Sequence, residues 1–257
     1  MSQAPDRLAP LADVRDEGLR IVQAADERGL PVRLIGGVAV WARCPSAMLP
    51  ELRREYGDVD VIGHARQSRE LTPFLESMGY QADRLFNAIH GAQRLNFADA
   101  ATGRSLDVLL DKFVMSHELD LRDRLTVDKL TIPLADLLLT KLQVVQINDK
   151  DMVDLAAMLA DHEPGTATGH ENIDLRRFTN VLGRDWGFEH TVRLNLAKLR
   201  EYVAGRELPE QLAARIDERI GALLSALDSG GKSVGWKLRN QVGERVRWYE
   251  LPEEGRH

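Results

Sequence analysis

The sequence predicts an α+β fold with a mixed sheet of about five strands, flanked by helices and followed by a helical C-terminal domain. A short apolar run at residues 32–35 is followed at once by a glycine pair and an apolar helical segment at 38–43, which indicates a strand, a turn and a helix. Residues 92–98 and 104–110 alternate in polarity on either side of a turn at Thr102-Gly103, which predicts a β-hairpin. The third observation is a series of amphipathic helical segments in the last third of the chain.

We expect two domains, one at residues 1–160 and a helical one at residues 171–257. The stretch between them, 161–170, is rich in Gly, Pro and Thr and indicates a linker. The C-terminal domain has predicted helices at 172–182, 189–203 and 209–227, and then a tail rich in Lys and Arg that contains Trp236 and Trp248. Basic residues interleaved with aromatic ones can bind a nucleic-acid strand. Docking of the tail by its tryptophans is the other interpretation.

Composition excludes several classes of protein. The chain has 257 residues, a net charge of −6 and a hydrophobic fraction of 44%, which is typical of a globular protein without a global basic field. Its one cysteine, Cys44, cannot form an intramolecular disulfide. No apolar run reaches the length of a membrane span, and we expect no secretion signal and a cytoplasmic protein. No His/Cys cluster has the spacing of zinc ligands.

Residues 34–63 carry the candidate site. Gly36 and Gly37 lie on the predicted strand-to-helix turn, where backbone N–H groups can bind a phosphate. About twenty residues later, Asp58 and Asp60 alternate with valines in an apolar run, so both carboxylates project to the same side of a strand. Such neighbouring carboxylates repel each other unless a cation or a proton lies between them. Hard oxygen ligands favour magnesium.

The glycine pair, the D-x-D pair and a later carboxylate at Asp107 together resemble the nucleotidyltransferase superfamily related to DNA polymerase β. The resemblance covers roughly residues 34–155 and implies a polymerase-β-like core. It also implies transfer of a nucleoside monophosphate from an NTP to an acceptor hydroxyl, with release of pyrophosphate. Asp58, Asp60 and Asp107 would then be catalytic and would bind two magnesium ions (Mg2+), while Gly36 and Gly37 would bind the β- and γ-phosphates.

A second motif begins at Pro133, which opens a predicted helix. Lys141 falls on the apolar stripe of that helix, where a charged group must snorkel to water or find an anion. The next helix opens with Lys150-Asp-x-x-Asp-Leu, for which we expect Asp149 as the N-cap. The two helices resemble the AbiEii-type branch of the superfamily, which implies that Lys141 and Asp151 belong to the active site. Lys141 would be catalytic and bind the triphosphate, and Asp151 would bind the base, the ribose or the acceptor.

The resemblance leaves the acceptor open between a small molecule such as an antibiotic and the 3′ end of a tRNA. It also implies an antitoxin as a partner of the toxin-type members. The alternative function is a non-catalytic nucleotidyltransferase-fold binding module or an antitoxin-like protein. The presence of all three aspartates, Asp58, Asp60 and Asp107, argues against that alternative.

Overall fold

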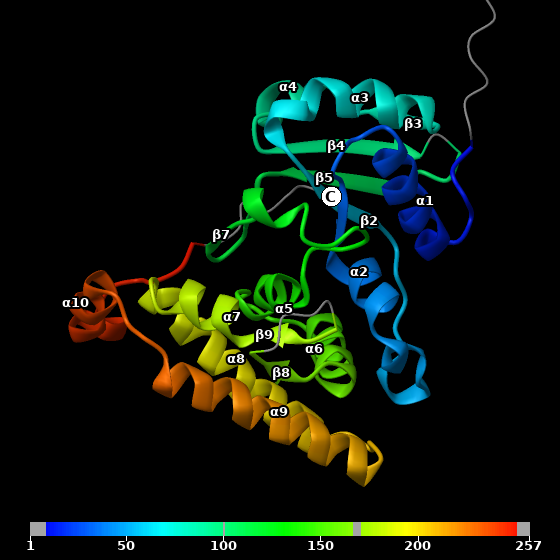
Figure 1. The fold of residues 1–257 in the computed structure, drawn as a ribbon. Helices are drawn as coiled ribbons and strands as arrows, with labels where there is room; N and C mark the ends of the chain where they lie inside the picture. The colour runs from blue at the N-terminus through cyan, green and yellow to red at the C-terminus, as the bar shows by residue number, and fades with distance from the viewer. Residues whose placement is uncertain (1–8, 100, 167–170, 251–257) are drawn as a thin grey trace, which may run out of the picture. The chain divides into compact units, whose positions relative to one another are not determined.

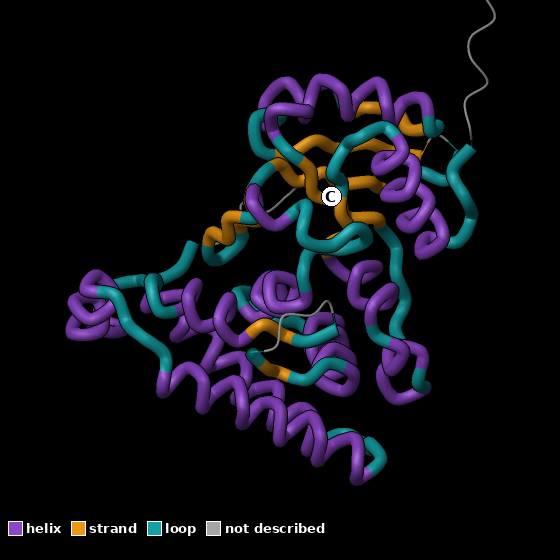
Figure 2. Tube along the Cα trace, in the orientation of Figure 1, coloured by secondary structure: helices purple, strands orange, loops and turns teal. Residues whose placement is uncertain are grey.

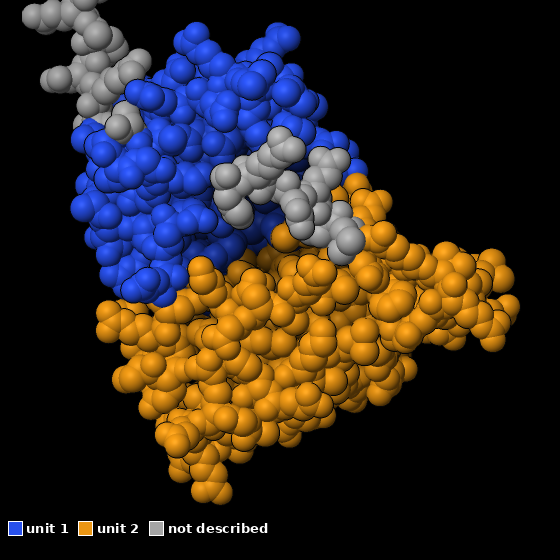
Figure 3. All heavy atoms as spheres, turned by 180° about the vertical axis from the view of Figure 1, so that it is seen from behind, with its two compact units in different colours: residues 1–42, 55–113, 120–132 blue, residues 43–54, 114–119, 133–257 orange. Residues whose placement is uncertain are grey.

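The computed structural model describes residues 9–99, 101–166 and 171–250 (Figure 1). The chain forms two compact units, which Figure 3 colours separately. Unit 1 comprises residues 1–42, 55–113 and 120–132, and unit 2 comprises residues 43–54, 114–119 and 133–257. The units therefore divide differently from the predicted boundary at 160–171, because the segment from residue 133 onward packs with the C-terminal helices. Parts of the predicted domains and linker, 1–8, 100, 167–170 and 251–257, lie outside the described residues.

Unit 1 is built on a five-stranded mixed sheet, as the sequence predicted. The strand order is β1-β2-β5-β4-β3, and only the β2–β5 pair is parallel within it. The predicted hairpin is present as β4 and β5. The bounds are β1 (Arg33–Ile35), β2 (Val59–Gly63), β3 (Tyr80–Ala82), β4 (Arg94–Asp99) and β5 (Ser105–Leu110).

One face of this sheet is apolar and buried. Alternation along β2 and β5 turns Val59, Val61, Leu106 and Val108 to this face, and all four are at most 1% exposed. Helix α1 (Val14–Glu27) packs here through Gly18, where a Cβ atom would lie 2.9 Å from Val38 Cγ1. Helix α3 (Ser68–Ser77) packs beside β3. The opposite face of the same strands carries Asp60 and Asp107 together with the apolar residues Ile62 and Leu109.

Several elements of unit 1 differ from the prediction. Strand β3 and the short helix α4 (Arg84–His90) lie in a stretch without a clear periodic pattern and were not expected. After the 3-10 turn Arg122–Arg124, residues 126–132 reach β1, where Thr131 and Leu34 form an isolated bridge.

Unit 2 is helical, with short strand pairs (Figure 2). Within the described ranges the small sheets pair β6 with β7 and β8 with β9. Strands β8 and β9 belong to unit 2, whereas β6 and β7 each have residues in both units. The segment 43–54 contributes two 3-10 turns. The bounds are α5 (Leu134–Leu142), α6 (Asp149–Asp161), α7 (Leu175–Leu182), α8 (Trp186–Ala204), α9 (Glu210–Ser229), α10 (Val234–Val242), β6 (Lys112–Val114), β7 (Glu118–Asp120), β8 (Pro164–Gly165) and β9 (Ile173–Asp174).

Helix α5 is the core of unit 2, with eight of its nine residues buried. Its C-terminal end is held by Asn195 of α8, whose Nδ2 donates to the carbonyls of Leu142 and Val144, both at 2.8 Å. These bonds satisfy carbonyls that a helix end leaves without partners. The N-cap of α6 is Asn148, which accepts from the Asp151 N–H at 3.0 Å, so the expectation of Asp149 at this position was wrong by one residue.

The C-terminal tail forms α10, which is attached to α8 through its polar and aromatic side. Trp186 Nε1 donates to Asn240 Oδ1 at 2.7 Å, and Trp248 Nε1 donates to Thr191 at 3.1 Å. Of the two tryptophans of the tail, Trp248 thus docks on α8, and nucleic-acid binding by the basic residues stays a prediction. The opposite side of α10 presents Val234 and Leu238, which are 75% and 60% exposed. None of the described helices combines the length and apolar character that a membrane crossing requires.

Candidate site on the polar face of the sheet

The parallel pairing of β2 with β5 places Asp60 directly beside Asp107. Strands in a sheet lie about 4.8 Å apart, so two side chains that share a rung and a face are close neighbours. Asp58 precedes Asp60 by two residues at the entry to β2 and is exposed, whereas Asp60 and Asp107 are half-buried. These three predicted site residues belong to unit 1.

Gly36 lies against Asp60, on the rung that Asp60 shares with Asp107. Helix α2 (Gly36–Arg43) follows β1 without a linker, as predicted, and Ile35 pairs with Asp60 across β1 and β2. Gly36 has a φ of +71°, and a Cβ atom there would lie 2.5 Å from Asp60 Oδ2. The turn therefore requires glycine for its backbone conformation and for the space that the Asp60 carboxylate occupies. Beside it, Gly37 begins the first turn of α2, whose N–H groups have no carbonyl partner within the helix.

Asp107 is held by two residues of β4. Arg94 forms a bidentate ion pair with it, with Nε 3.0 Å from Oδ1 and Nη2 2.8 Å from Oδ2. Asn96, which pairs with Asp107 across the strands, donates from Nδ2 to Oδ1 at 2.9 Å. The hydrogen bond to Asp107 raises the pKa of the Arg94 guanidinium, and the charge of Asp60 acts in the same direction.

The carboxylates at this rung are of the chemical type that binds a divalent metal. Carboxylate oxygens from Asp58, Asp60 and Asp107 are the hard ligands that Mg2+ prefers. The guanidinium of Arg94 is already a cation bound to Asp107, so the site is suited to positive charge. In the described residues, however, no three His, Cys, Asp or Glu side chains are arranged to hold a metal ion. Asp107 points its oxygens at Arg94, and a metal there would have to replace it.

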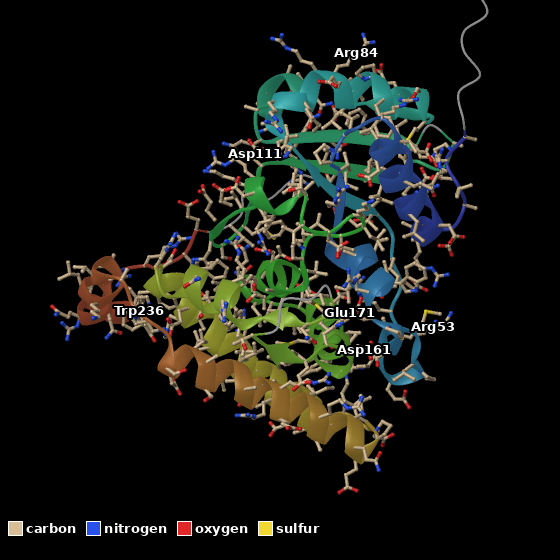
Figure 4. The ribbon with its side chains drawn as sticks, in the orientation of Figure 1. Arg53, Arg84, Asp111, Asp161, Glu171 and Trp236 are labelled. Carbon is tan, nitrogen blue, oxygen red and sulfur yellow. The ribbon has the colours of Figure 1, made fainter. Side chains whose placement is uncertain are left out.

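Asp111 lies at the far end of β5 from this rung and serves the backbone (Figure 4). Its φ is +63°, which an Asp tolerates better than most residues, and its Oδ1 accepts from the Ala65 N–H at 3.1 Å. Asp111 is therefore a turn residue and not a member of the candidate site.

Lys141 and Asp151 lie in unit 2, where they belong to a buried cluster of charges. Lys141 Nζ is 2.9 Å from Asp151 Oδ1 and 2.8 Å from Asp154 Oδ2. Asp154 also receives a bidentate pair of bonds from Arg54, at 2.7 and 2.8 Å. The Asp154 side chain is 1% exposed and that of Lys141 is 12% exposed. Lys141, which lies on the apolar stripe of α5, thus finds its anionic partners within unit 2.

Electrostatics favour the charged form of Lys141 despite its burial. Desolvation alone would lower its pKa, but the nearby charges of Asp154 and Asp151 outweigh that effect and raise it. Arg54 supplies a second cation to Asp154. Two cations and two carboxylates therefore compensate one another in the Lys141 cluster, which we define as Arg54, Lys141, Asp151 and Asp154.

Sequence reasoning missed Arg94, Asn96 and Asp154. Arg94 and Asn96 could have been found from the predicted hairpin. A turn centred on residues 101–102 places Asn96 opposite Asp107, and Arg94 lies on the same face of the sheet as Asn96. The signal for Asp154 was its position three residues after Asp151, which places both side chains on one side of α6.

Comparisons with known proteins were made for the whole chain. No family model and no curated protein matches it. One solved structure, an antigenic nucleotidyltransferase-like protein from Paracoccidioides brasiliensis, has 13% identity and a TM-score of 0.41, over 88% of this chain and 96% of that chain. The solution structure of the antibiotic-resistance factor ANT(2'')-Ia has 15% identity and a TM-score of 0.34, over 80% of this chain and 92% of that chain. The assignment to the AbiEii-type branch of the nucleotidyltransferases stays a prediction.

Replacing Gly36 by Ala should destabilise the protein more than the same change at Gly29. Gly29 has a nearly identical φ of +70°, but a Cβ atom there would meet no other atom within 4 Å, so Gly29→Ala reports the backbone conformation alone. That cost is about 1–2 kcal/mol. Gly36→Ala should cost a further ~1–3 kcal/mol because the new methyl group collides with Asp60. Urea unfolding of both variants measures the difference, and equal losses would show that Asp60 is not seated against Gly36.

Lys141→Met should lower the free energy of unfolding by about 3–5 kcal/mol, because it removes one member of a buried ion pair and leaves a carboxylate without its partner. Lys150→Met is the matched control, since Lys150 lies on the adjacent helix and is exposed. That change should alter stability by less than about 0.5 kcal/mol. Denaturant titration of both variants is the measurement, and a Lys141→Met protein as stable as wild type would contradict the pairing.

Proposed function

We propose that unit 1 transfers a nucleoside monophosphate from an NTP to an acceptor hydroxyl, with pyrophosphate as the leaving group. The observation that carries the proposal is the shared rung of Asp60 and Asp107 with Gly36 packed against Asp60. This arrangement brings two carboxylates and the N-terminal turn of a helix to the same end of β2. A helix N-terminus attracts phosphate, and carboxylates attract the cation that a triphosphate carries.

Each residue has a defined part in this proposal. Asp58, Asp60 and Asp107 would hold the two Mg2+ ions, which when bound stabilise the entering and leaving oxygens of an in-line displacement. The backbone at Gly36 and Gly37 binds the β- and γ-phosphates, and the missing side chain at Gly36 leaves room for the Asp60 carboxylate beside them. Asp107 accepts the proton of the acceptor hydroxyl once that hydroxyl comes within hydrogen-bond reach.

The acceptor is a hydroxyl of a small molecule such as an antibiotic or of the 3′ end of a tRNA. The predicted roles of Lys141 on the triphosphate and of Asp151 on the base, ribose or acceptor stay predictions, because both residues are engaged in the Lys141 cluster of unit 2. An antitoxin partner would accompany a tRNA-directed activity and not one directed at a small molecule.

One observation favours the alternative function of a non-catalytic binding module. Arg94 engages both oxygens of Asp107 and so occupies positions that a metal ion would need. The two functions differ in whether Asp107 can exchange this guanidinium for a cation.

Transfer should depend on Asp60 and not on a carboxylate elsewhere in unit 1. Wild type, Asp60→Asn and Glu70→Gln would each be incubated with Mg2+ and one α-labelled NTP at a time, together with total tRNA or a panel of aminoglycosides and lincosamides. Glu70 is an exposed residue of α3 and serves as the control. We expect Asp60→Asn to lose label transfer by more than about a hundredfold, since metal-assisted charge stabilisation contributes several kcal/mol.

Thermal melts accompany that assay so that loss of activity is separated from loss of fold. Asp60→Asn should remain folded, because the change removes one charge from a group of like charges. If it keeps full transfer activity in the presence of magnesium, Asp60 is not part of the site. If wild type labels none of the acceptors under conditions in which nucleotide and metal bind, the non-catalytic alternative is favoured.

A further inference from the structure

We propose that Arg94 is the residue that sets the affinity of this site for a divalent cation, and that a cation binds to Asp107 in exchange for the Arg94 guanidinium. The inference rests on the proposed function, because it concerns the same carboxylates. It assigns a positioning role to a residue of β4 that lies outside the glycine turn and the three aspartates.

The Asp107 carboxylate already accepts three hydrogen bonds. Its Oδ1 accepts from Arg94 Nε and Asn96 Nδ2, and its Oδ2 accepts from Arg94 Nη2. A carboxylate offers about four lone-pair positions, so three hydrogen bonds leave little room for a metal ion at about 2.0–2.1 Å. A guanidinium and a metal ion on the same carboxylate would also repel each other.

The ion pair between Arg94 and Asp107 can be broken. The Arg94 side chain is 46% exposed, whereas that of Asp107 is 15% exposed, so water can solvate the guanidinium when the bidentate pair opens. The Asn96 bond, by contrast, comes from the rung partner of Asp107 and can persist when Arg94 leaves. Asn96 would then keep the carboxylate oriented while its other lone pairs are offered to the cation.

A place for the released side chain exists on α4. The Arg94 guanidinium carbon already lies 5.8 Å from the centroid of the Phe86 ring, at the outer limit of a cation–π contact. Phe86 is half-buried, which fixes its ring beside β4. A modest rotation of the Arg94 side chain away from Asp107 therefore keeps a favourable contact instead of leaving the guanidinium with water alone.

The test measures cation binding by the full chain, with Mn2+ as the probe and free Mn2+ followed by electron paramagnetic resonance. Arg94→Gln removes the competing cation, and Arg94→Lys keeps the charge but loses the bidentate geometry. Arg84→Gln is the matched control, because it removes the same charge from an exposed residue of α4 (Figure 4). We expect Arg94→Gln to bind Mn2+ about tenfold more tightly than wild type, Arg94→Lys to be intermediate, and Arg84→Gln to be within about twofold of wild type.

A second readout follows the exchange directly. In 15N-labelled protein, the Arg94 Nε–H resonance is assigned by its loss in Arg94→Gln and is protected while it donates to Asp107. Addition of Mg2+ to wild type should speed its exchange with water. This measurement stands even if Arg94→Gln folds poorly, since Arg94→Lys can supply the assignment.

The outcomes separate the two proposals. If wild type binds Mn2+ through Asp60 and Arg94→Gln binds it no more tightly, the exchange is wrong while the proposed function stands. If neither protein binds Mn2+, and Asp60→Asn changes nothing, the carboxylates are not metal ligands and both proposals fail. If Arg94→Gln gains affinity that Asp60→Asn abolishes, but no NTP is ever consumed, the exchange holds and the transfer reaction does not.

Discussion

The register between β2 and β5 is the constraint on which the site depends. Because side chains alternate along a strand, a slip of one residue would turn Asp60 into the core and bring Val59 or Val61 to the polar face. That slip is opposed by the apolar face, where Val59, Val61 and their partners on β5 are buried. Burial of such side chains contributes about 1.5–3 kcal/mol each. The hydrophobic core on one face therefore holds two mutually repelling carboxylates side by side on the other.

Local sequence patterns predicted most of the elements of unit 1. The features that they did not predict depend on contacts between residues far apart in the sequence. The strand, glycine turn and helix at residues 33–43 and the hairpin around Gly103 were predictable because each is encoded in a few adjacent residues. The division of the chain into two units was not predictable in this way. Helix α5 is buried on nearly every side, which means that it must be surrounded by other helices, but periodicity alone does not say which. Its neighbours are α6, α7 and α8, so the predicted boundary after residue 160 separated helices that pack together.

The residues of the candidate site were likewise predictable only in part. Gly36, Asp58, Asp60 and Asp107 were predictable from residue type and spacing, and the structure brings Gly36, Asp60 and Asp107 to one rung. Arg94 was not predicted, because an arginine on a half-exposed strand is ordinary until the hairpin register places it beside a carboxylate. For Lys141 the sequence predicted a need for an anion, and it left open which anion. The structure supplies Asp151 and Asp154, which lie one helix further along the chain.

The Lys141 cluster and the carboxylates on the sheet differ in how their ion pairs balance charge. In the Lys141 cluster, two cations meet two carboxylates in a largely buried setting, so adding or removing a charge there is costly. On the sheet, Arg94 faces Asp107 while the carboxylates of Asp58 and Asp60 lie beside it, so among these named groups the negative charges outnumber the positive one. Exposure to water keeps this excess tolerable, and a divalent cation would offset it. The charges of the Lys141 cluster therefore compensate one another, whereas the carboxylates on the sheet are the groups to which the proposed function assigns a cation.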